Sequence, residues 1–562
     1  MTRSWLGFGG LAFVVAACSG GGGSSGGGGS GGVAGHAAGG SGGARGSGGA
    51  QGSGGLSGTG GQVEKGGVSG GPNPGSGGIK GTGGQGGLGL GGSPGGGGAG
   101  GAGHGGTGGA GPTGGTAGGR AGGGAGGSPG NGGKGGHASG EGGRPGTAGA
   151  GGTATPSLAL AAVTAFPAAE TALLGLRVAV NSQDTAVVLG PSATSTVDPG
   201  PMLTWVPRTG SPTKKTFAGD VTPSVMALDG ADAIWLAGQL WKPVTFGGSQ
   251  VAADPSSYYL VKLNADGSNV FTKAVARTES NLLGITVYGI AFDGQGNAYV
   301  AGGLMIDSAS LTSAVFVSKF SPAGALLMDR VFQDDDTQAL AFDVAIAPNG
   351  DVVIAGMFDA TLHVGSTTLT SLAGTSTNGF VAVLNAADLA PKNAFSFGGA
   401  EGYDVAYAVD VVSSGAVRVA GGMSAASTIA GTPVSAGASG TAFVAEVTAT
   451  GNRADFVDLI GAQGIAFQTS TDAADRTFVA GRLDGATHDA FLAIVAPDGG
   501  LTMPWRHDTG AAANGATTVA ADRHGGVWVG GELQGRVDLG MGAIGDTSDP
   551  TAFTNFLLHF EP

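Results

Sequence analysis

The stretch Tyr299-Val300-Ala301-Gly302 is one copy of a phrase that decides the fold of this chain: a short apolar strand that closes on glycine. The other copies are Ala186–Gly190, Ile234–Gly238, Val353–Gly356, Arg418–Gly421, Phe478–Gly481 and Trp528–Gly531. The closing residues are Gly190, Gly238, Gly302, Gly356, Gly421, Gly481 and Gly531, and they recur every 48 to 65 residues. This period is that of a β-propeller blade. The sequence therefore predicts an all-β fold, a seven-bladed β-propeller with four-stranded blades.

One repeat shows the expected layout of a blade. An alternating strand at 287–292 is followed by the turn 293–297, the glycine-ended strand, a third strand at 314–320 and a fourth at 325–332. Alternation and Gly- or Asp-rich turns are typical of antiparallel strands. We expect the repeat glycines at an inner position of the blade, where strands crowd the axis and a side chain would not fit.

Four repeats carry a further pattern between their second and third strands, an apolar pair separated by glycine and polar residues. It occurs at 246–251, 364–369, 429–434 and 539–544. We interpret it as an extra hairpin or long loop on one face of the ring, where a propeller usually keeps its function.

The last repeat ends at its third strand, 555–560, and so lacks a fourth. An apolar run, Leu158–Phe166, precedes the first repeat. We predict that this run pairs with 555–560 as the outer strand of the last blade, which would close the ring and remove an exposed edge.

Phrases such as Gly296-Asn297-Ala298-Tyr299-Val300-Ala301-Gly302 resemble the bacterial SBBP-type β-propeller repeat. The resemblance covers about 172–562. It implies a propeller of the secreted or lipidated kind, and it carries no catalytic motif over to this chain.

The N-terminus has the pattern of a lipoprotein signal peptide, residues 1–18. Arg3 supplies positive charge, Leu6–Ala17 is an apolar run too short to span a bilayer, and Val15-Ala16-Ala17-Cys18 resembles the bacterial lipobox. Cys18 is the only cysteine. The resemblance implies that its thiol takes a lipid and anchors the protein to a membrane. In the lipoprotein family an Asp directly after the lipidated Cys often retains the protein at the inner membrane. Because Ser19 stands at that position here, the resemblance implies the outer membrane of a Gram-negative bacterium.

Residues 19–155 are dominated by glycine and contain almost nothing to bury. We interpret them as a disordered tether with a reach of about 60–70 Å. The remaining part, 156–562, is the predicted propeller. After residue 154 the chain carries 18 basic and 37 acidic residues, a net charge of −19. Such a surface repels phosphate backbones, so nucleic acid is not an expected partner.

Catalytic and metal-binding patterns are sparse. The histidines of the propeller, among them His363, His524 and His559, lack metal-site spacing. The densest acidic cluster, Asp334-Asp335-Asp336, is either a calcium site or a solvated turn between blades. Trp235, Tyr299 and Trp528 share one repeat position. This favours a role in packing the core or the blade interfaces, and not a role as a platform that binds sugars. We predict no cofactor.

Three functions fit this pattern: a binding module, an enzyme and a structural component. The leading hypothesis is a monomeric, lipid-anchored binding module outside the cytoplasm, with a protein or glycan ligand on the propeller. The alternative is a propeller enzyme acting on glycans, a hydrolase or lyase, which would need carboxylates with perturbed pKa values converging at the axis. A structural surface-layer component is the third.

Overall fold

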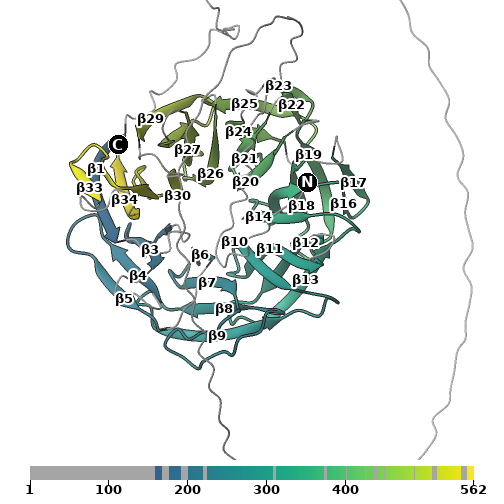
Figure 1. The fold of residues 1–562 in the computed structure, drawn as a ribbon, viewed down its shortest axis with the longest axis horizontal. Coiled ribbons are helices and arrows are strands. Elements are labelled where there is room, and N and C mark those ends of the chain that lie inside the picture. Colours follow the sequence, from purple (N-terminus) through teal and green to yellow (C-terminus); the bar gives the residue numbers. More distant parts are fainter. Residues whose placement is uncertain are drawn as a thin grey trace, which may run out of the picture. The chain divides into compact units, whose positions relative to one another are not determined.

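The chain folds into a ring of seven antiparallel four-stranded sheets, which confirms the seven-bladed propeller (Figure 1). The computed structural model describes residues 158–167, 176–191, 200–218, 224–307, 312–371, 376–399, 402–424, 426–435, 440–448, 450–461, 463–485, 488–508, 515–545 and 553–562. The signal peptide, Cys18 and the predicted tether lie outside these residues. Among the described residues, none forms a helix long and apolar enough to cross a membrane.

The first three blades follow the chain from the axis outward. Blade 1 contains β2 (Arg177–Val180), β3 (Ala186–Pro191), β4 (Pro201–Val206) and β5 (Thr213–Thr216). Blade 2 contains β6 (Val225–Leu228), β7 (Ile234–Gln239), β8 (Ser257–Leu263) and β9 (Asn269–Ala276). Blade 3 contains β10 (Gly284–Phe292), β11 (Ala298–Asp307), β12 (Thr312–Phe320) and β13 (Leu326–Phe332).

Blades 4 to 6 follow the same plan, and blades 4 and 5 each carry an added hairpin. Blade 4 contains β14 (Ala339–Ile346), β15 (Val352–Phe358), β18 (Asn378–Leu384) and β19 (Pro391–Phe397), with the hairpin β16 (Thr361–Val364) and β17 (Thr367–Thr370). Blade 5 contains β20 (Val405–Val411), β21 (Val417–Met423), β24 (Thr441–Val447) and β25 (Ala454–Ile460), with the hairpin β22 (Ala426–Ile429) and β23 (Thr432–Ser435). Blade 6 contains β26 (Gly464–Thr471), β27 (Thr477–Asp484), β28 (His488–Val495) and β29 (Leu501–Asp508).

Blade 7 joins the two ends of the propeller, as the sequence predicts. It contains β30 (Gly515–Ala521), β31 (Val527–Gln534) and β34 (Phe553–Glu561), with the hairpin β32 (Arg536–Asp538) and β33 (Ala543–Gly545). Its outer strand is β1 (Ala159–Pro167), which pairs antiparallel with β34 from Ala159 opposite Glu561 to Pro167 opposite Thr554. The closure prediction is therefore confirmed. The pairing covers an edge that would otherwise be open to other chains.

The core is divided among the spaces between blades. Within the described residues there are seven clusters of buried hydrophobic side chains, and each lies between two neighbouring blades. The cluster between blades 7 and 1 contains Phe166 of β1, Val188 and Trp528. Each blade therefore needs both neighbours to bury its two faces, which is the physical reason for a closed ring.

The repeat glycines lie in the second strand of each blade, and in blades 3 to 7 their close approach is to a bulge in the first strand. A Cβ at Gly302 would lie 2.0 Å from the carbonyl oxygen of Thr286, and one at Gly356 would lie 1.9 Å from that of Leu340. Gly421, Gly481 and Gly531 face equivalent carbonyls. The pairing register shifts at the same place in these five blades. This corrects the expectation that crowding at the axis selects glycine, because the steric conflict lies within each blade.

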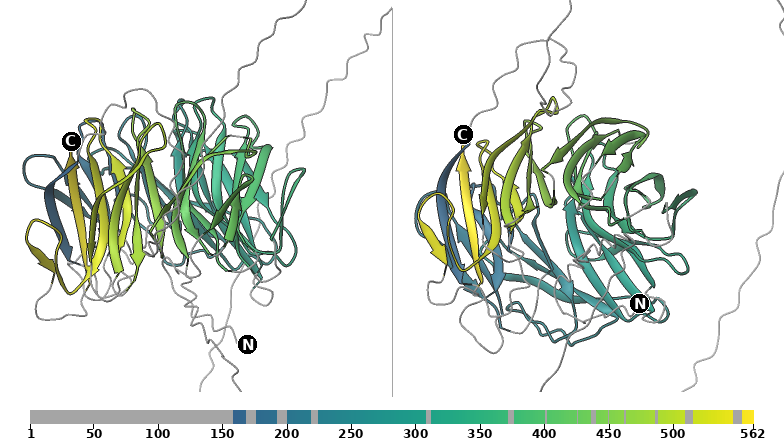
Figure 2. Two further views of the ribbon diagram at one scale, coloured as in Figure 1. Left: turned by 90° about the horizontal axis from the view of Figure 1, so that it is seen from above. Right: turned by 45° about the horizontal axis from the view of Figure 1, so that its top comes forward.

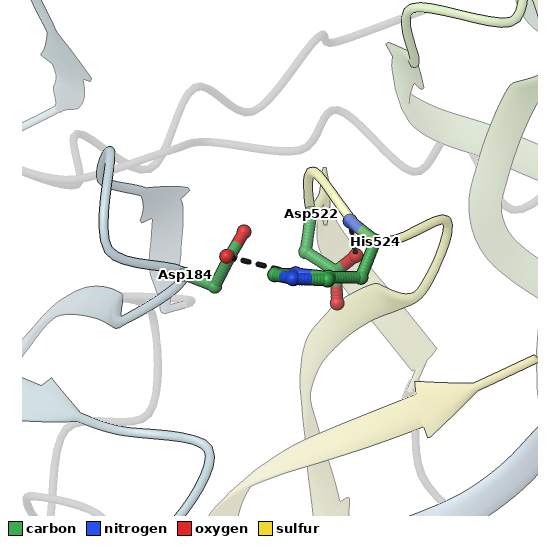
Figure 3. Close-up of side chains that lie close together, drawn as sticks. All are labelled: Asp184, Asp522 and His524. Atoms are coloured by element: carbon green, nitrogen blue, oxygen red, sulfur yellow. Dashed lines mark hydrogen bonds and ion pairs between the residues drawn. The ribbon is translucent and has the colours of Figure 1, made fainter.

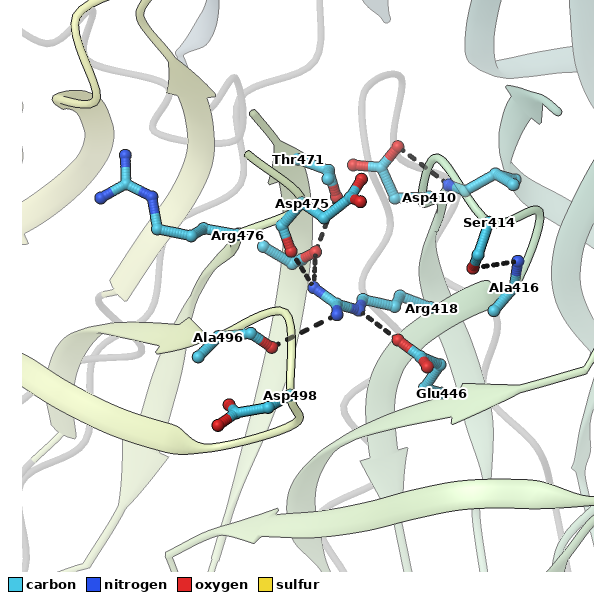
Figure 4. Close-up of polar contacts among 12 residues, drawn as sticks. Asp410, Ser414, Ala416, Arg418, Glu446, Thr471, Asp475, Arg476, Ala496 and Asp498 are labelled. Atoms are coloured by element: carbon cyan, nitrogen blue, oxygen red, sulfur yellow. Dashed lines mark hydrogen bonds and ion pairs between the residues drawn. The ribbon is translucent and has the colours of Figure 1, made fainter. Parts of the chain in front are cut away.

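Polar side chains join the blades where hydrophobic contact ends. The innermost strands do not pair with one another, and side-chain oxygens accept hydrogen bonds from their N–H groups instead. Asp343 accepts from Val409 N at 3.0 Å, and Gln468 accepts from Val519 N at 3.0 Å. Further out, the buried guanidinium of Arg418 joins blade 5 to blade 6 (Figure 4). Its nitrogen donates to the carbonyl of Asp475 at 2.7 Å.

Candidate functional site

The two faces of the ring differ in their loops (Figure 2). One face, which we call the turn face, carries the short turns that join first to second and third to fourth strands. The other, the hairpin face, carries the second-to-third connections and the links between blades. All four predicted insertions lie there: β16–β17, β22–β23, β32–β33 and the bridge between Val244 and Val251. The prediction of extra hairpins on one face is confirmed, and this face is the candidate for ligand contact.

The acidic cluster Asp334-Asp335-Asp336 lies on this face, in the link between β13 and β14. Asp334 anchors a hairpin: its carboxylate accepts from His363 N at 2.6 Å and contacts His363 Nδ1 at 2.6 Å. Asp336 has a left-handed backbone, with φ of 59°. These contacts match a turn that positions the β16–β17 hairpin. The calcium interpretation of the three residues stays a prediction.

Among the described residues, one group brings together side chains of the kind that hold metal ions, namely Asp184, Asp522 and His524 (Figure 3). It joins the first turns of blades 1 and 7 on the turn face. Asp184 accepts from Arg523 N at 2.9 Å, and its other oxygen lies 2.9 Å from His524 Nδ1. Asp522 accepts from the backbone of His524 and Gly526, and its second oxygen lies 3.1 Å from His559 Nε2. Each carboxylate oxygen thus already has a nitrogen within hydrogen-bonding distance.

Two other blade junctions repeat the Asp184 contact without a histidine. Asp232 accepts from Ser182 N at 2.8 Å, and Asp475 accepts from Ser413 N at 2.8 Å. Asp184, Asp232 and Asp475 all occupy the left-handed fourth position of the first turn. We call this contact the turn staple. Because it recurs where no third ligand is supplied, the cluster in Figure 3 is better explained as a structural contact than as a metal site.

The aspartates at the first position of these turns also make structural contacts, in their case with side chains of buried residues. Asp229 accepts from Trp235 Nε1 at 3.0 Å and pairs with Lys262 at 3.0 Å, while Lys262 lies 5.0 Å from the centre of the Trp235 ring. In blade 7 the ring of His559 stacks on Trp528 at 4.0 Å. The large rings at this repeat position are buried, so the prediction that they pack in the core is confirmed.

A second set of aromatic side chains, which sequence reasoning missed, lies on the innermost strands. The set is Tyr288, Phe342, Tyr407 and Phe467, one from each of blades 3 to 6, and we call it the axial arc. Successive ring centroids are 5.1, 5.1 and 6.0 Å apart. Each ring belongs to the bulged part of a first strand and stands fourteen residues before a repeat glycine. That constant offset is the signal that the sequence offered.

Ionisable groups accompany the axial arc. Burial raises the pKa of Asp343 to about 7, although N–H groups of Val409 and Val344 favour its charged form. Burial likewise raises the pKa of Asp410, on the next innermost strand. On the hairpin side of the arc, burial raises the pKa of Glu532 to about 7, against the opposing effect of the Arg482 guanidinium.

These acids only partly meet the requirement for an enzyme. Asp343 and Asp410 come from adjacent blades, but both accept backbone N–H bonds that occupy oxygens a general base would use. Glu532 comes from blade 7 and has Arg482 as its charged neighbour. Asp404, whose pKa burial raises to about 6, is held by Gly399 N and Ser424 N next to the blade 5 hairpin.

No family model and no curated protein matches the chain. Three of the solved structures that the chain resembles have low identity and low TM-scores. A protein of unknown function from Dyadobacter fermentans is 13% identical over 72% of this chain and 100% of its own, with a TM-score of 0.36. The polysaccharide lyase Uly1 is 12% identical over 69% of this chain and 90% of its own, with a TM-score of 0.40. Raptor from Chaetomium thermophilum is 9% identical over 72% of this chain and 29% of its own, with a TM-score of 0.38. At these values they carry no argument about activity.

Proposed function

We propose that this protein is a lipid-anchored binding module outside the cytoplasm, whose hairpin face contacts a protein or glycan ligand. The observation that carries the proposal is the asymmetry of the ring. Tight turns make up one face, whereas the added hairpins of blades 4, 5 and 7 gather on the other. A scaffold held rigid by inter-blade contacts and bearing variable loops on one face is suited to recognition.

The anchor and the location rest on the sequence. A lipid on Cys18 would hold the protein at a membrane, and residues 19–155 would carry the propeller away from it. We place the protein on the outer membrane of a Gram-negative bacterium, as a monomer. The acidic charge of the propeller argues against nucleic acid as its partner.

Labelled palmitate tests the anchor. We expect the full chain to incorporate the label and Cys18→Ala to incorporate none, because no other thiol is present. Ser19→Ala, which keeps the thiol, is the control and should be labelled like the unaltered protein. Equal labelling of Cys18→Ala would end the lipoprotein interpretation.

The hairpin face is tested by removing one hairpin. In one variant, Thr361–Thr370 is replaced by a short Gly-Ser turn. In the control, the turn 321–324 on the opposite face is exchanged for another tight turn. Binding of detergent-solubilised full chain to intact cells, peptidoglycan and lipopolysaccharide is then measured. We expect the first variant alone to lose binding. Equal binding by both variants, or no binding by the unaltered protein, would contradict the proposal.

One observation favours the enzymatic alternative, the raised pKa of Glu532. Burial brings it to about 7, where a carboxyl can exchange protons in either direction near neutral pH. As a glycan hydrolase or lyase, the unaltered protein would release new chain ends from a bacterial polysaccharide, and Glu532→Gln would stop the release. Absence of chain ends with the unaltered protein would reject this alternative.

A further inference from the structure

The axial arc repeats the symmetry of the ring. Its rings meet at interplanar angles of 59°, 39° and 67°. These values scatter around about 51°, the rotation from one blade to the next in a seven-bladed ring. The four side chains therefore keep nearly the same orientation toward the axis. All four are half-buried, and none of them belongs to a hydrophobic cluster between blades, which favours a position at the axis over one between two blades.

The spacing of the rings sets the size of a group that fits between them. Neighbours 5.1 to 6.0 Å apart on a seven-fold ring lie about 6–7 Å from its axis, which is close to the limit at which a cation is attracted to an aromatic ring. Once the thickness of the rings is subtracted, the space suits a compact group better than a sugar chain. The arc can therefore act as an aromatic cage for a cation that lies off the axis, on the side of the rings.

Two carboxyl groups belong to the same innermost strands as the arc. Asp343 directly follows Phe342, and Asp410 lies on the next innermost strand. Burial, and in second place the charge of Asp410, raise the pKa of Asp343 to about 7, and a bound cation would favour its charged form. The whole propeller, with its net charge of −19 after residue 154, draws cations toward it.

One end of the arc already holds a cation. The Arg482 guanidinium lies 6.0 Å from the centre of the Phe467 ring, and its Nε is 2.6 Å from Asp484. Its charge is therefore balanced locally. Tyr288, Phe342 and Tyr407 lie further from it along the arc, and Asp343 is the residue after Phe342.

From this arrangement we propose that the axial arc binds an alkylammonium group, with Tyr288, Phe342 and Tyr407 as ring partners and Asp343 as the nearby anion. Quaternary ammonium is the cation that such cages recognise best, because it is large, weakly hydrated and attracted to ring faces. The site goes beyond the proposed function. It depends on the innermost strands and not on the hairpin face, so either proposal can fail while the other stands.

Calorimetry on the unlipidated full chain tests the site with choline and with 3,3-dimethylbutan-1-ol, its neutral isostere. The isostere has the same shape and lacks the charge. We expect saturable binding of choline and at least about tenfold weaker binding of the isostere. Equal affinities would overturn the proposal, as would the absence of saturable choline binding at millimolar concentrations.

Two variants locate the binding. Phe342→Leu and Tyr407→Leu keep apolar bulk but remove a ring, and each should weaken choline binding about threefold or more. Phe271→Leu, on the outer strand of blade 2, is the control and should leave it unchanged. Unchanged affinity in both arc variants would show that choline binds elsewhere. If one variant does not fold, as judged by its circular dichroism, the other variant and the isostere still decide.

A third probe distinguishes the source of the cation. A trimethyllysine residue blocked at both ends carries the same ammonium group on a peptide. Binding tighter than that of choline would assign the site to a modified peptide, and weaker binding would assign it to a free small molecule. The axial cation site is supported in either case.

Discussion

At the scale of the residue, the repeat glycine is explained by a single contact. In five blades its missing Cβ leaves room for a carbonyl oxygen of the bulged first strand, as at Gly356 and Leu340. The bulge in turn moves an aromatic ring such as Phe342 out of the pleat and into the axial arc. The repeat glycine thus permits both the close pairing of the first and second strands and the position of the aromatic rings in the axial arc.

Gly356→Ala should therefore be strongly destabilising. The new methyl group would lie 1.9 Å from the Leu340 oxygen, which cannot move without breaking the blade. We expect a loss of about 3 kcal/mol in the free energy of unfolding, measured with urea. Gly294→Ala is the control, since a Cβ there meets nothing within 4 Å. A Gly356→Ala protein as stable as the control would refute this role of the glycine.

Buried acids should make the protein more stable in mild acid than at alkaline pH. Burial raises the pKa values of Asp343 and Glu532 to about 7 and that of Asp404 to about 6, so the folded state binds more protons than the unfolded state. This stabilisation is complete below about pH 4, the unfolded value, and is lost as the pH rises to about 7.

The turn aspartates act in the opposite direction and at lower pH. Despite burial, hydrogen bonds hold the pKa values of Asp229, Asp293 and Asp522 below the usual value, so their stabilisation is lost in stronger acid. We expect the highest melting temperature near pH 4–5, with a decline toward pH 8 that is smaller in Asp343→Asn. A melting temperature that rises from pH 5 to pH 8 would contradict this account.

At the scale of the element, strand β1 is the outer strand of a blade whose other three strands come from the opposite end of the propeller. It pairs with β34 along almost its whole length, and Leu160 and Val163 pack on the core between blades 6 and 7. Arg208 of blade 1 also pairs with Glu561 of β34 at 2.6 Å. That contact is partly exposed and adds little beside the strand pairing.

Deletion of residues 156–168 should cost about 3 kcal/mol or more in unfolding free energy, because it removes these contacts and leaves β34 as an open edge. The bare edge should also promote association between chains, which light scattering would detect. A deletion of equal length at 130–142 is the control. Equal stability of the two deletion proteins would show that β1 does not hold the ring closed.

At the scale of the whole molecule, stability is distributed among contacts between neighbours. Seven clusters between blades bury the apolar side chains. Neighbouring blades are also joined by the turn staples and by side chains such as Asp343, which accept hydrogen bonds from the backbone of the next innermost strand. The stretch 19–155 is rich in glycine and poor in large apolar side chains.

Removal of residues 30–140 should consequently leave the melting temperature of the propeller unchanged within about 2 °C, since a glycine-rich tract has almost nothing to bury. Calorimetry on the shortened and the complete chain makes the comparison. A clear fall in melting temperature would mean that the tract packs on the propeller.

The sequence by itself determined the number of blades, the order of their strands, the four insertions and the pairing that closes the ring. Strand alternation and turn residues are local signals, and the glycine period and the missing fourth strand of the last repeat can be read along the chain without knowledge of its fold. Only the tertiary structure showed why the glycines are needed, that Asp184 serves as a contact between blades, and that Tyr288 and Phe342 come together on innermost strands. The glycine contacts depend on bulges that bring together residues about sixteen positions apart, and the other two features join residues of neighbouring blades that lie more than fifty positions apart in the chain.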